Sequence, residues 1–374
     1  MTERTCSSSE YALDRLPATV AAKCTGEFQR GYAAILLIAI ICTAGATWFM
    51  TSFGAHSVRI ERERKTAAVL ALAKQALIGR AAIDDTLPGS LPCPDISTHI
   101  AGSNMPDDGI ADLFAGTNCP SYVGRLPWRT LGLADLRDAD GERLWYALSP
   151  NFRDFASQVH INDTTRGTLT VSGVTSLTNV AAIVFAPGAP LNGQSRNGAA
   201  NQNSVANYLD GINATGGAVY LAQPADDNFN DRLATITVAD LMAIVEKRVA
   251  NEITAALNQY FLANAQLPRP ALQTDFNCQP NGDQTLCTPS VAIASGLLPR
   301  NISQGAGWPG IVFPTWFNAN WRTSVSYTIA PECSSAPACS SAAFSTTNNA
   351  SVFTPKITLV IGSYTRLTVR LFAS

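Results

Sequence analysis

The sequence predicts an α+β protein in which one long N-terminal helix packs on an antiparallel sheet. A charge-free, strongly apolar run extends from Gly31 to Val58, and a stretch with few helix breakers follows as far as Ile83. Short segments rich in β-forming residues follow, bounded by Gly, Pro, Asn or Ser. Six cysteines beyond the apolar run fall in three local pairs, which is typical of loops closed by disulfides in an exported protein.

The composition excludes direct nucleic-acid binding from the functions that we expect. The 374 residues have a net charge of −2, from 26 basic and 28 acidic side chains. The chain therefore lacks an excess of positive charge for a phosphate backbone. It also shows no RNP, helix-turn-helix or Cys/His finger pattern.

The apolar run is long enough to cross a membrane. At about 1.5 Å per residue, Gly31 to Val58 spans roughly 42 Å, more than the ~30 Å hydrocarbon core of a bilayer. We predict a cytoplasmic leader over residues 1–31 and a single transmembrane helix over residues 32–56. A signal peptide cut near Ala44-Gly45-Ala46 is the alternative.

The helix becomes two-faced beyond this segment, where an apolar stripe indicates packing on a globular body. The stripe consists of Val69, Leu70, Leu72, Ala73, Ala76 and Leu77.

The paired cysteines predict three local disulfides, each closing a loop for about 2–3 kcal/mol, and a body outside the cytosol. The pairs are Cys93 with Cys119, Cys278 with Cys287, and Cys333 with Cys339. Unrelated buried thiols, a zinc site and other connectivities remain alternatives. Four basic residues at positions 59–65 would by themselves favour the opposite orientation of the span.

A second amphipathic helix is predicted to begin at Thr237, because Asp240 three residues on completes a capping box. Its buried face would carry apolar side chains at intervals of three or four residues, from Val238 to Tyr260. The face toward water would carry Asp240, Glu246, Arg248 and Glu252.

The elements recur in order, which predicts two tandem modules over residues 57–236 and 237–374. Each module has a helix, then Leu-Pro-x-Pro (91–94 and 267–270), Gly-x-Leu-Pro (124–127 and 296–299), and a Tyr-initiated segment ending in Pro (146–150 and 327–331). Residues 151–236 would be either an insertion or the rest of the first sheet.

Strands are expected over six stretches. They are Glu142–Pro150, Gly167–Val171, Val180–Phe185, Ala218–Leu221, Lys356–Ile361 and Thr365–Phe372.

The leader end Gln29-Arg30-Gly31, followed by Tyr32-Ala33-Ala34-Ile35-Leu36, resembles the processing region of the type IV pilin and type II secretion pseudopilin superfamily. The resemblance implies that a prepilin peptidase cuts after Gly31 and methylates Tyr32. It also implies a bitopic protein of the bacterial inner membrane with a periplasmic body. Its partners would be other pilin or pseudopilin subunits.

One departure from that family concerns the fifth residue after Gly31, which is Leu36 where most pilins carry Glu. In the family this carboxylate pairs in lipid with a neighbouring subunit's N-terminal amine. Without this Glu the chain resembles the K-type minor pseudopilin, and that resemblance implies a subunit at the filament tip.

No catalytic pattern is present. His56, His99 and His160 belong to no recognisable triad or ligand set, and Gly193–Gly198 is one residue too long for a nucleophile elbow. No cofactor is expected. Calcium at the acidic loops around Asp107, Asp138 and Asp226 stays open as the alternative to solvated turns.

The sequence thus predicts a non-enzymatic minor subunit that initiates or caps a type IV pilus or a type II secretion pseudopilus. A membrane-anchored adhesin or binding module is the first alternative, and a periplasmic hydrolase is the second. The five tryptophans beyond the span, at positions 128, 145, 308, 316 and 321, are expected in the core and not on a carbohydrate platform.

Overall fold

The computed structural model describes residues 29–96, 108–157, 159–264, 267–279, 287–290, 293–300, 313–329, 341–346 and 356–358. The chain divides into two compact units, Met1–Ile60 and Glu61–Ser374. The predicted boundary at 236/237 lies inside the second unit, so the division into two modules stays a prediction.

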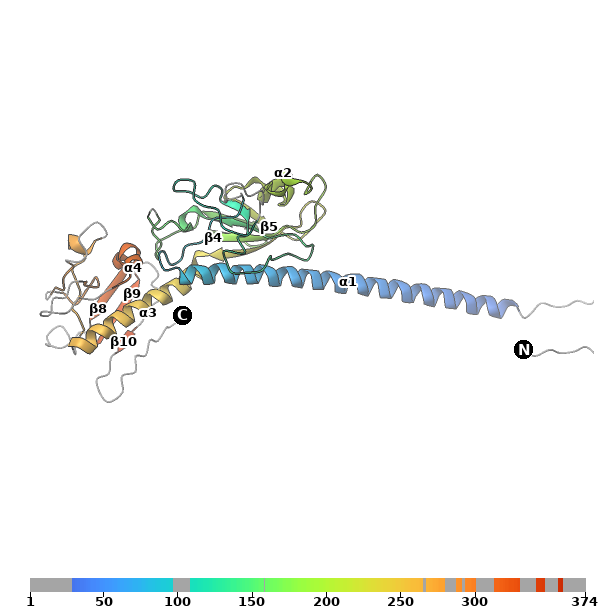
Figure 1. Cartoon of the computed structure of the whole chain (residues 1–374). Coiled ribbons are helices and arrows are strands. Elements are labelled where there is room, and N and C mark those ends of the chain that lie inside the picture. Colours follow the sequence, from blue (N-terminus) through green and yellow to red (C-terminus); the bar gives the residue numbers. More distant parts are fainter. Residues whose placement is uncertain are drawn as a thin grey trace, which may run out of the picture. The chain divides into compact units, whose positions relative to one another are not determined.

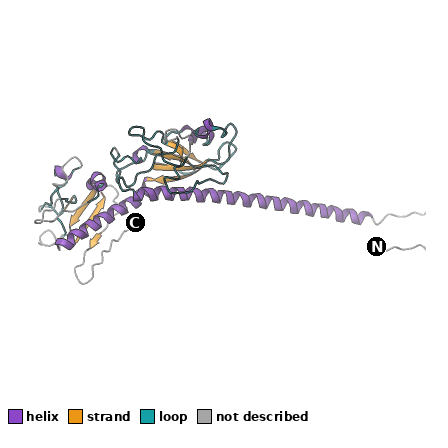
Figure 2. Cartoon of the chain, in the orientation of Figure 1, coloured by secondary structure: helices purple, strands orange, loops and turns teal. Residues whose placement is uncertain are grey.

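The fold is mixed α/β, with the elements labelled in Figure 1. The helices are α1 (Gln29–Ile83), α2 (Ala199–Gln202), α3 (Val238–Asn264) and α4 (Thr315–Asn320). The strands are β1 (Val123–Arg125), β2 (Trp145–Leu148), β3 (Leu169–Gly173), β4 (Leu177–Ala186), β5 (Val219–Ala222), β6 (Arg232–Thr237), β7 (Ser295–Gly296), β8 (Val325–Ile329), β9 (Ser341–Thr346) and β10 (Lys356–Thr358). Figure 2 separates these helices from the strands and loops by colour.

The second half of α1 supplies one layer of the body. Leu70, Ala73, Leu77 and Ala81 are buried at 0–5% exposure, one or two helical turns apart, as an amphipathic helix requires. Leu72, expected in the same stripe, is 44% exposed, because it lies about 100° or more around the helix from each of the buried positions.

The first sheet follows the path β1-β2-β4-β3-β5, and β6 pairs with the other edge of β4. Residues 151–236 supply β3 to β6, so this stretch completes the first sheet. The expectation of an antiparallel sheet is wrong at one pairing, because β3 and β5 run parallel. The long connection that contains β4 permits this, since parallel neighbours need a crossover.

Both faces of this sheet are buried, and its strands alternate between two cores. Tyr146 and Val184 belong to the core that contains the α1 residues. Trp145 and Phe185 belong to a second core that includes Tyr208, from the segment that covers the other face. The alternation follows from the two-residue period of a strand. It is interrupted in β4 at Ala181 and Ala182, which both belong to the first core, where the register with β6 shifts.

The capping box that begins α3 is confirmed. The main-chain N–H of Asp240 donates to Oγ1 of Thr237 over 3.1 Å, and the N–H of Thr237 donates to Oδ2 of Asp240 over 3.0 Å. Lys74 of α1 lies 3.0 Å from the same carboxylate oxygen.

The predicted apolar face of α3 is buried, but Glu246, which we expected to face water, is only 2% exposed. The core around α3 contains residues of α1 and also of β8 and α4. A helix packed against several elements buries a wider arc than the single face that its apolar pattern predicts.

The second sheet has the order β10-β9-β8-β7 and is antiparallel throughout. The predicted strand from Lys356 is present as β10, whereas Thr365–Phe372 lies outside the described residues. The two sheets share a register: Gly124 lies opposite Tyr146 in the first, and Gly296 lies opposite Tyr327 in the second.

The Leu-Pro-x-Pro segments also occupy matching places in the two sheets. Asp95 and Arg125 exchange two main-chain hydrogen bonds of 3.0 and 2.8 Å, and Ala271 and Leu297 exchange two of 2.8 Å. In both cases the residue after the second proline pairs with the residue after the glycine.

Candidate functional site

The most distinctive surface of the first unit is an apolar stretch of α1. Six large aliphatic side chains between positions 35 and 41 are each 60–65% exposed. They are Ile35, Leu36, Leu37, Ile38, Ile40 and Ile41. Because successive helical residues are turned by about 100°, these side chains surround the helix and do not form one face.

One helical segment among the described residues, Ser57–Ile83, is long and apolar enough to cross a membrane, with a mean hydropathy of 1.3. Ile35–Gly45 is a shorter apolar segment. The core helix of a soluble protein meets the same criteria as a membrane span. Leu70, Ala73 and Leu77 of Ser57–Ile83 pack within the protein core, so this part of the segment belongs to the body.

The predicted processing residues Gly31 and Tyr32 lie within α1. Their cleavage stays a prediction, and so does the span over residues 32–56.

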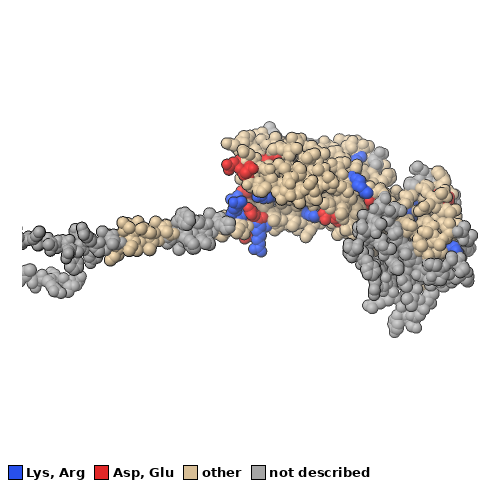
Figure 3. All heavy atoms as spheres, turned by 180° about the vertical axis from the view of Figure 1, so that it is seen from behind, with Lys and Arg blue, Asp and Glu red and all other residues tan. Residues whose placement is uncertain are grey.

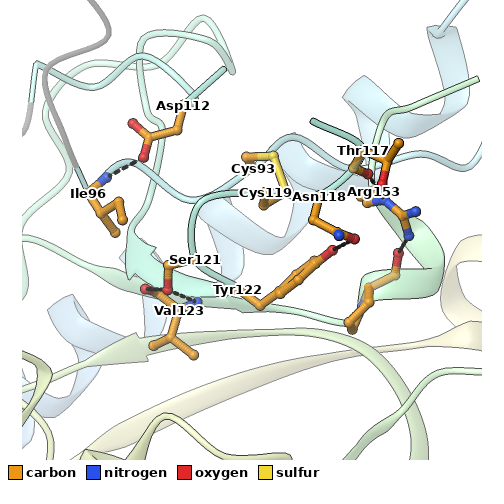
Figure 4. Close-up of a disulfide and its surroundings, with 11 residues drawn as sticks. Cys93, Ile96, Asp112, Thr117, Asn118, Cys119, Ser121, Tyr122, Val123 and Arg153 are labelled. Atoms are coloured by element: carbon orange, nitrogen blue, oxygen red, sulfur yellow. Dashed lines mark hydrogen bonds between the residues drawn. A yellow bond between two sulfur atoms is a disulfide. The ribbon is translucent and has the colours of Figure 1, made fainter. Parts of the chain in front are cut away.

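Two of the three predicted cysteine pairs lie at disulfide distance. Cys93 and Cys119 are joined by an S–S bond of 2.02 Å and are both buried in the main core. Figure 4 shows this disulfide beside the loop that it closes. Arg153 donates from Nε to the carbonyl of Thr117 over 2.7 Å, and the Tyr122 hydroxyl donates to Asn118 over 3.1 Å.

The second pair, Cys278 and Cys287, is joined by an S–S bond of 2.09 Å and has a small core of its own with Ala271 and Leu297. Cys333 and Cys339 lie outside the described residues. Cys42, in the apolar stretch of α1, is a free and exposed cysteine.

The buried carboxylates of the acidic loops accept hydrogen bonds from main-chain N–H groups. Asp138 is 1% exposed, and its Oδ1 accepts from the N–H groups of Asp140 and Glu142 over 2.9 Å. Its Oδ2 accepts from the N–H of Gly188 over 2.9 Å. Burial, opposed by these hydrogen bonds, raises the pKa of Asp138. Oxygens committed to main-chain donors favour the structural-turn interpretation over calcium.

The loop that contains Asp226 ends in a similar arrangement. Asp231 is 2% exposed and accepts from the N–H of Asp210 over 2.9 Å, while Asp210 accepts from the N–H of Asp231 over 3.2 Å. Burial, together with the nearby Asp210 carboxylate, raises the pKa of Asp231 to about 7. Asp107, named for the first acidic loop, lies outside the described residues.

The described residues hold no group of three or more His, Cys, Asp and Glu side chains that could bind a metal ion. The exposed His160 contacts Asn320, with Nδ1 and Oδ1 3.1 Å apart. Of the tryptophans, 145, 316 and 321 are buried, 128 is partly buried and 308 lies outside the described residues.

One group of side chains was not singled out from the sequence. The guanidinium carbon of Arg125 lies 4.5 Å from the ring centroid of Trp145 and 3.9 Å from that of Tyr208. The guanidinium carbon of Arg196 lies 4.6 Å from the same Tyr208 ring. These residues are too far apart in the sequence for any motif to show that they meet.

The visible face of the molecule in Figure 3 is mostly uncharged, in keeping with the 14% of charged residues. No protein-family model, curated protein or solved structure matches the chain.

Proposed function

We propose that this chain is a non-enzymatic, pilin-like minor subunit that initiates or caps a type IV pilus or a type II secretion pseudopilus. It would be held in the bacterial inner membrane by residues 32–56, with its body in the periplasm. The supporting observation is the ring of aliphatic side chains at positions 35–41, each 60–65% exposed.

Such a ring requires an apolar environment. Full burial of one large aliphatic side chain is worth about 1.5–3 kcal/mol. Covering the exposed fractions of all six would contribute roughly 5–10 kcal/mol. Lipid can supply this cover before assembly, and the helices of neighbouring subunits can supply it afterwards.

The body fits an oxidising compartment. Two disulfides, Cys93–Cys119 and Cys278–Cys287, close local loops in it. Disulfides persist outside the cytosol and are rare within it. This supports a periplasmic body despite the basic residues that follow the proposed span.

We also propose that the body consists of two related modules, residues 57–236 and 237–374. The shared pairing of Gly124 with Tyr146 and of Gly296 with Tyr327 supports this relation. A large body of this kind, together with Leu36 in place of Glu, suits a terminal subunit better than a repeating one.

Photo-cross-linking in the bacterial host tests the proposed docking. A photoreactive residue at Ile38 is expected to cross-link to a second pilin-like polypeptide, identified by mass spectrometry. The matched control is Ile83, which is also exposed on α1 but lies at the end within the body. Cross-links from Ile38 to lipid alone would support the non-polymerising anchored module instead.

A further inference from the structure

The first sheet ends in three outer strands, β1, β5 and β6, each of which pairs with one neighbour among the described strands. The free edge of such a strand presents a row of unpaired N–H and C=O groups, to which another polypeptide can bind as an added strand. Proteins usually cover these edges. In the described part of this chain, two of the three edges are covered and that of β6 is not.

The edges of β1 and β5 are covered by single residues. The main chain of Asp95 exchanges hydrogen bonds of 3.0 and 2.8 Å with that of Arg125 in β1. The side chain of Asn213 does the same for β5, because its oxygen accepts from the N–H of Leu221 over 2.7 Å and its amide donates to the carbonyl of Leu221 over 3.1 Å. Each residue thus makes the bonds that a further strand would make.

The outer edge of β6, opposite to β4, has no such cover among the described residues. Only β4 pairs with β6 there, and no loop or side chain bonds to the main chain from Arg232 to Ile236. Alternate residues of an antiparallel pair direct their N–H and C=O groups away from the partner strand. The next N–H along the chain, that of Thr237, donates to the Asp240 carboxylate of the α3 capping box.

A pocket of about 460 Å³ lies along this edge. Its lining includes residues 231–235 without a gap, although successive side chains of a strand point to opposite faces of the sheet. The pocket therefore follows the edge of β6 and not one face of it. Apolar side chains form its other wall, among them Val174, Leu177 and Ala222.

Three charged side chains line the pocket: Lys74, Asp231 and Arg232. Arg232 donates from Nη1 to the carbonyl of Gln223 over 3.4 Å and pairs with no carboxylate in the described part of the chain. Lys74 pairs with Asp240 over 3.0 Å. Asp231 is 2% exposed, and burial raises its pKa to about 7, which reduces its charge near neutral pH. Arg232 therefore supplies the unbalanced charge of the pocket.

From this arrangement we infer that the outer edge of β6 binds an extended segment of another protein, one that carries aliphatic side chains and a carboxylate. Main-chain hydrogen bonds to β6 supply the affinity, while the apolar wall and Arg232 select the side chains. This chain's own expected strand at Thr365–Phe372 contains two arginines, so like charges disfavour it as the occupant. The site does not depend on membrane insertion or on the proposed docking of α1.

Fluorescence anisotropy of the full-length chain in detergent tests the inference with two short, capped and labelled peptides. Both alternate valine with threonine, and one carries two glutamates where the other carries two lysines. We expect saturable binding of the acidic peptide, about tenfold tighter than that of the basic peptide and weakened by added NaCl. No binding of the acidic peptide at about 1 mM, or equal affinities of the two peptides, would overturn the inference.

A third peptide tests whether the main chain makes the contact. It has the acidic sequence, but N-methylation of its central amides removes the N–H donors from both edges of the strand. Because several hydrogen bonds to β6 are then lost, we expect its affinity to fall at least about tenfold. An N-methylated peptide that binds as well as the parent would show that no strand is added.

Amide hydrogen exchange of the wild-type chain locates the bound peptide. With the acidic peptide present, the amides from Arg232 to Ile236 should exchange more slowly. Those of β1, whose edge Asp95 covers, serve as the internal control and should not change. Protection of another strand without protection of β6 would contradict the assignment.

Arg232→Glu tests the charge selection. Reversal of this charge is expected to weaken binding of the acidic peptide about tenfold and to remove the preference for it over the basic peptide. Arg64→Glu makes the same change at an exposed arginine that does not line the pocket, and it should leave both affinities unchanged. Equal affinities of the two variants for the acidic peptide would refute the role of Arg232. The N-methylated peptide and hydrogen exchange use the wild-type chain, so they test the inference even if Arg232→Glu does not fold.

Discussion

Arg248 of α3 donates a hydrogen bond from Nη1 to the carbonyl oxygen of Ala82, in the last turn of α1, over 2.9 Å. The same nitrogen donates to the carbonyl of Asp84 over 2.7 Å. In return, Lys74 of α1 pairs with Asp240 of the α3 capping box. Arg248 thus places a positive charge at the C-terminal end of α1, where the helix dipole favours it, whereas Lys74 acts at the N-terminal end of α3 through the carboxylate of Asp240.

Arg248→Gln is expected to destabilise the body by about 2 kcal/mol, because charged hydrogen bonds to the end of α1 are lost. Urea unfolding of the full-length chain measures the change. Lys247→Gln, at the exposed neighbouring position, is the control and should have almost no effect. Equal effects of the two variants would show that Arg248 does not hold the helix end.

Gly296→Ala is expected to destabilise the protein by roughly 1–3 kcal/mol, the usual cost of overpacking. A Cβ atom at this position would lie 2.1 Å from the main-chain oxygen of Ala271, which cannot turn away as a side chain could. Gly79→Ala is the matched control, since α1 leaves open space there. It should stabilise the helix by about 1 kcal/mol. Opposite signs in thermal melts are the expected result, and a shared sign would refute it.

Removal of the two described disulfides should cost unequal amounts. The loops close over 26 residues for Cys93–Cys119 and 9 residues for Cys278–Cys287. Loop entropy gives about 3–4 kcal/mol for the double Ser variant of the first pair and about 2–3 kcal/mol for the second. Cys42→Ser, which removes a free thiol, is the control. An unfolding midpoint that reductant does not move would exclude both bonds.

Asp231→Asn should change how stability depends on pH. The folded protein keeps the Asp231 proton up to about pH 7, whereas the unfolded chain releases it near the ordinary value of 3.8. Stability should therefore fall as pH rises between about 4 and 7, by at most ~1.4 kcal/mol per pH unit from this group, and then level off. The variant lacks this contribution, so its unfolding midpoint should change less between pH 5 and pH 8.

Asp227→Asn, an exposed neighbour of the same loop, controls for the general loss of a carboxylate. It should retain the wild-type dependence on pH. If Asp231→Asn retains it as well, burial does not hold the proton on Asp231.

The elements that the sequence predicted best are those with strong local signals. The Thr237–Asp240 box begins α3 as expected, and the predicted strand Val180–Phe185 is the centre of β4. β6 was missed because its six residues run directly into α3 without a turn signal. The parallel pairing of β3 with β5 joins residues nearly 50 positions apart, and no local sequence pattern predicts such a pairing.

The charged groups were harder to predict. Glu246 is buried because α3 contacts elements that lie far from it in sequence, whereas the hydropathy pattern identifies only the apolar face of a helix. The arginines that lie against Tyr208, Arg125 and Arg196, are 71 residues apart, so composition and spacing gave no signal for their meeting.

The central claim is that α1 begins as a processed, apolar docking helix, and mass spectrometry of the mature N-terminus tests it most directly. The full-length chain should be extracted from membranes of cells with and without a prepilin peptidase. With the peptidase, we predict a chain that starts at methylated Tyr32, and without it a chain that keeps residues 1–31. The same N-terminus in both strains, whether uncut or cut after Ala46, would contradict the claim.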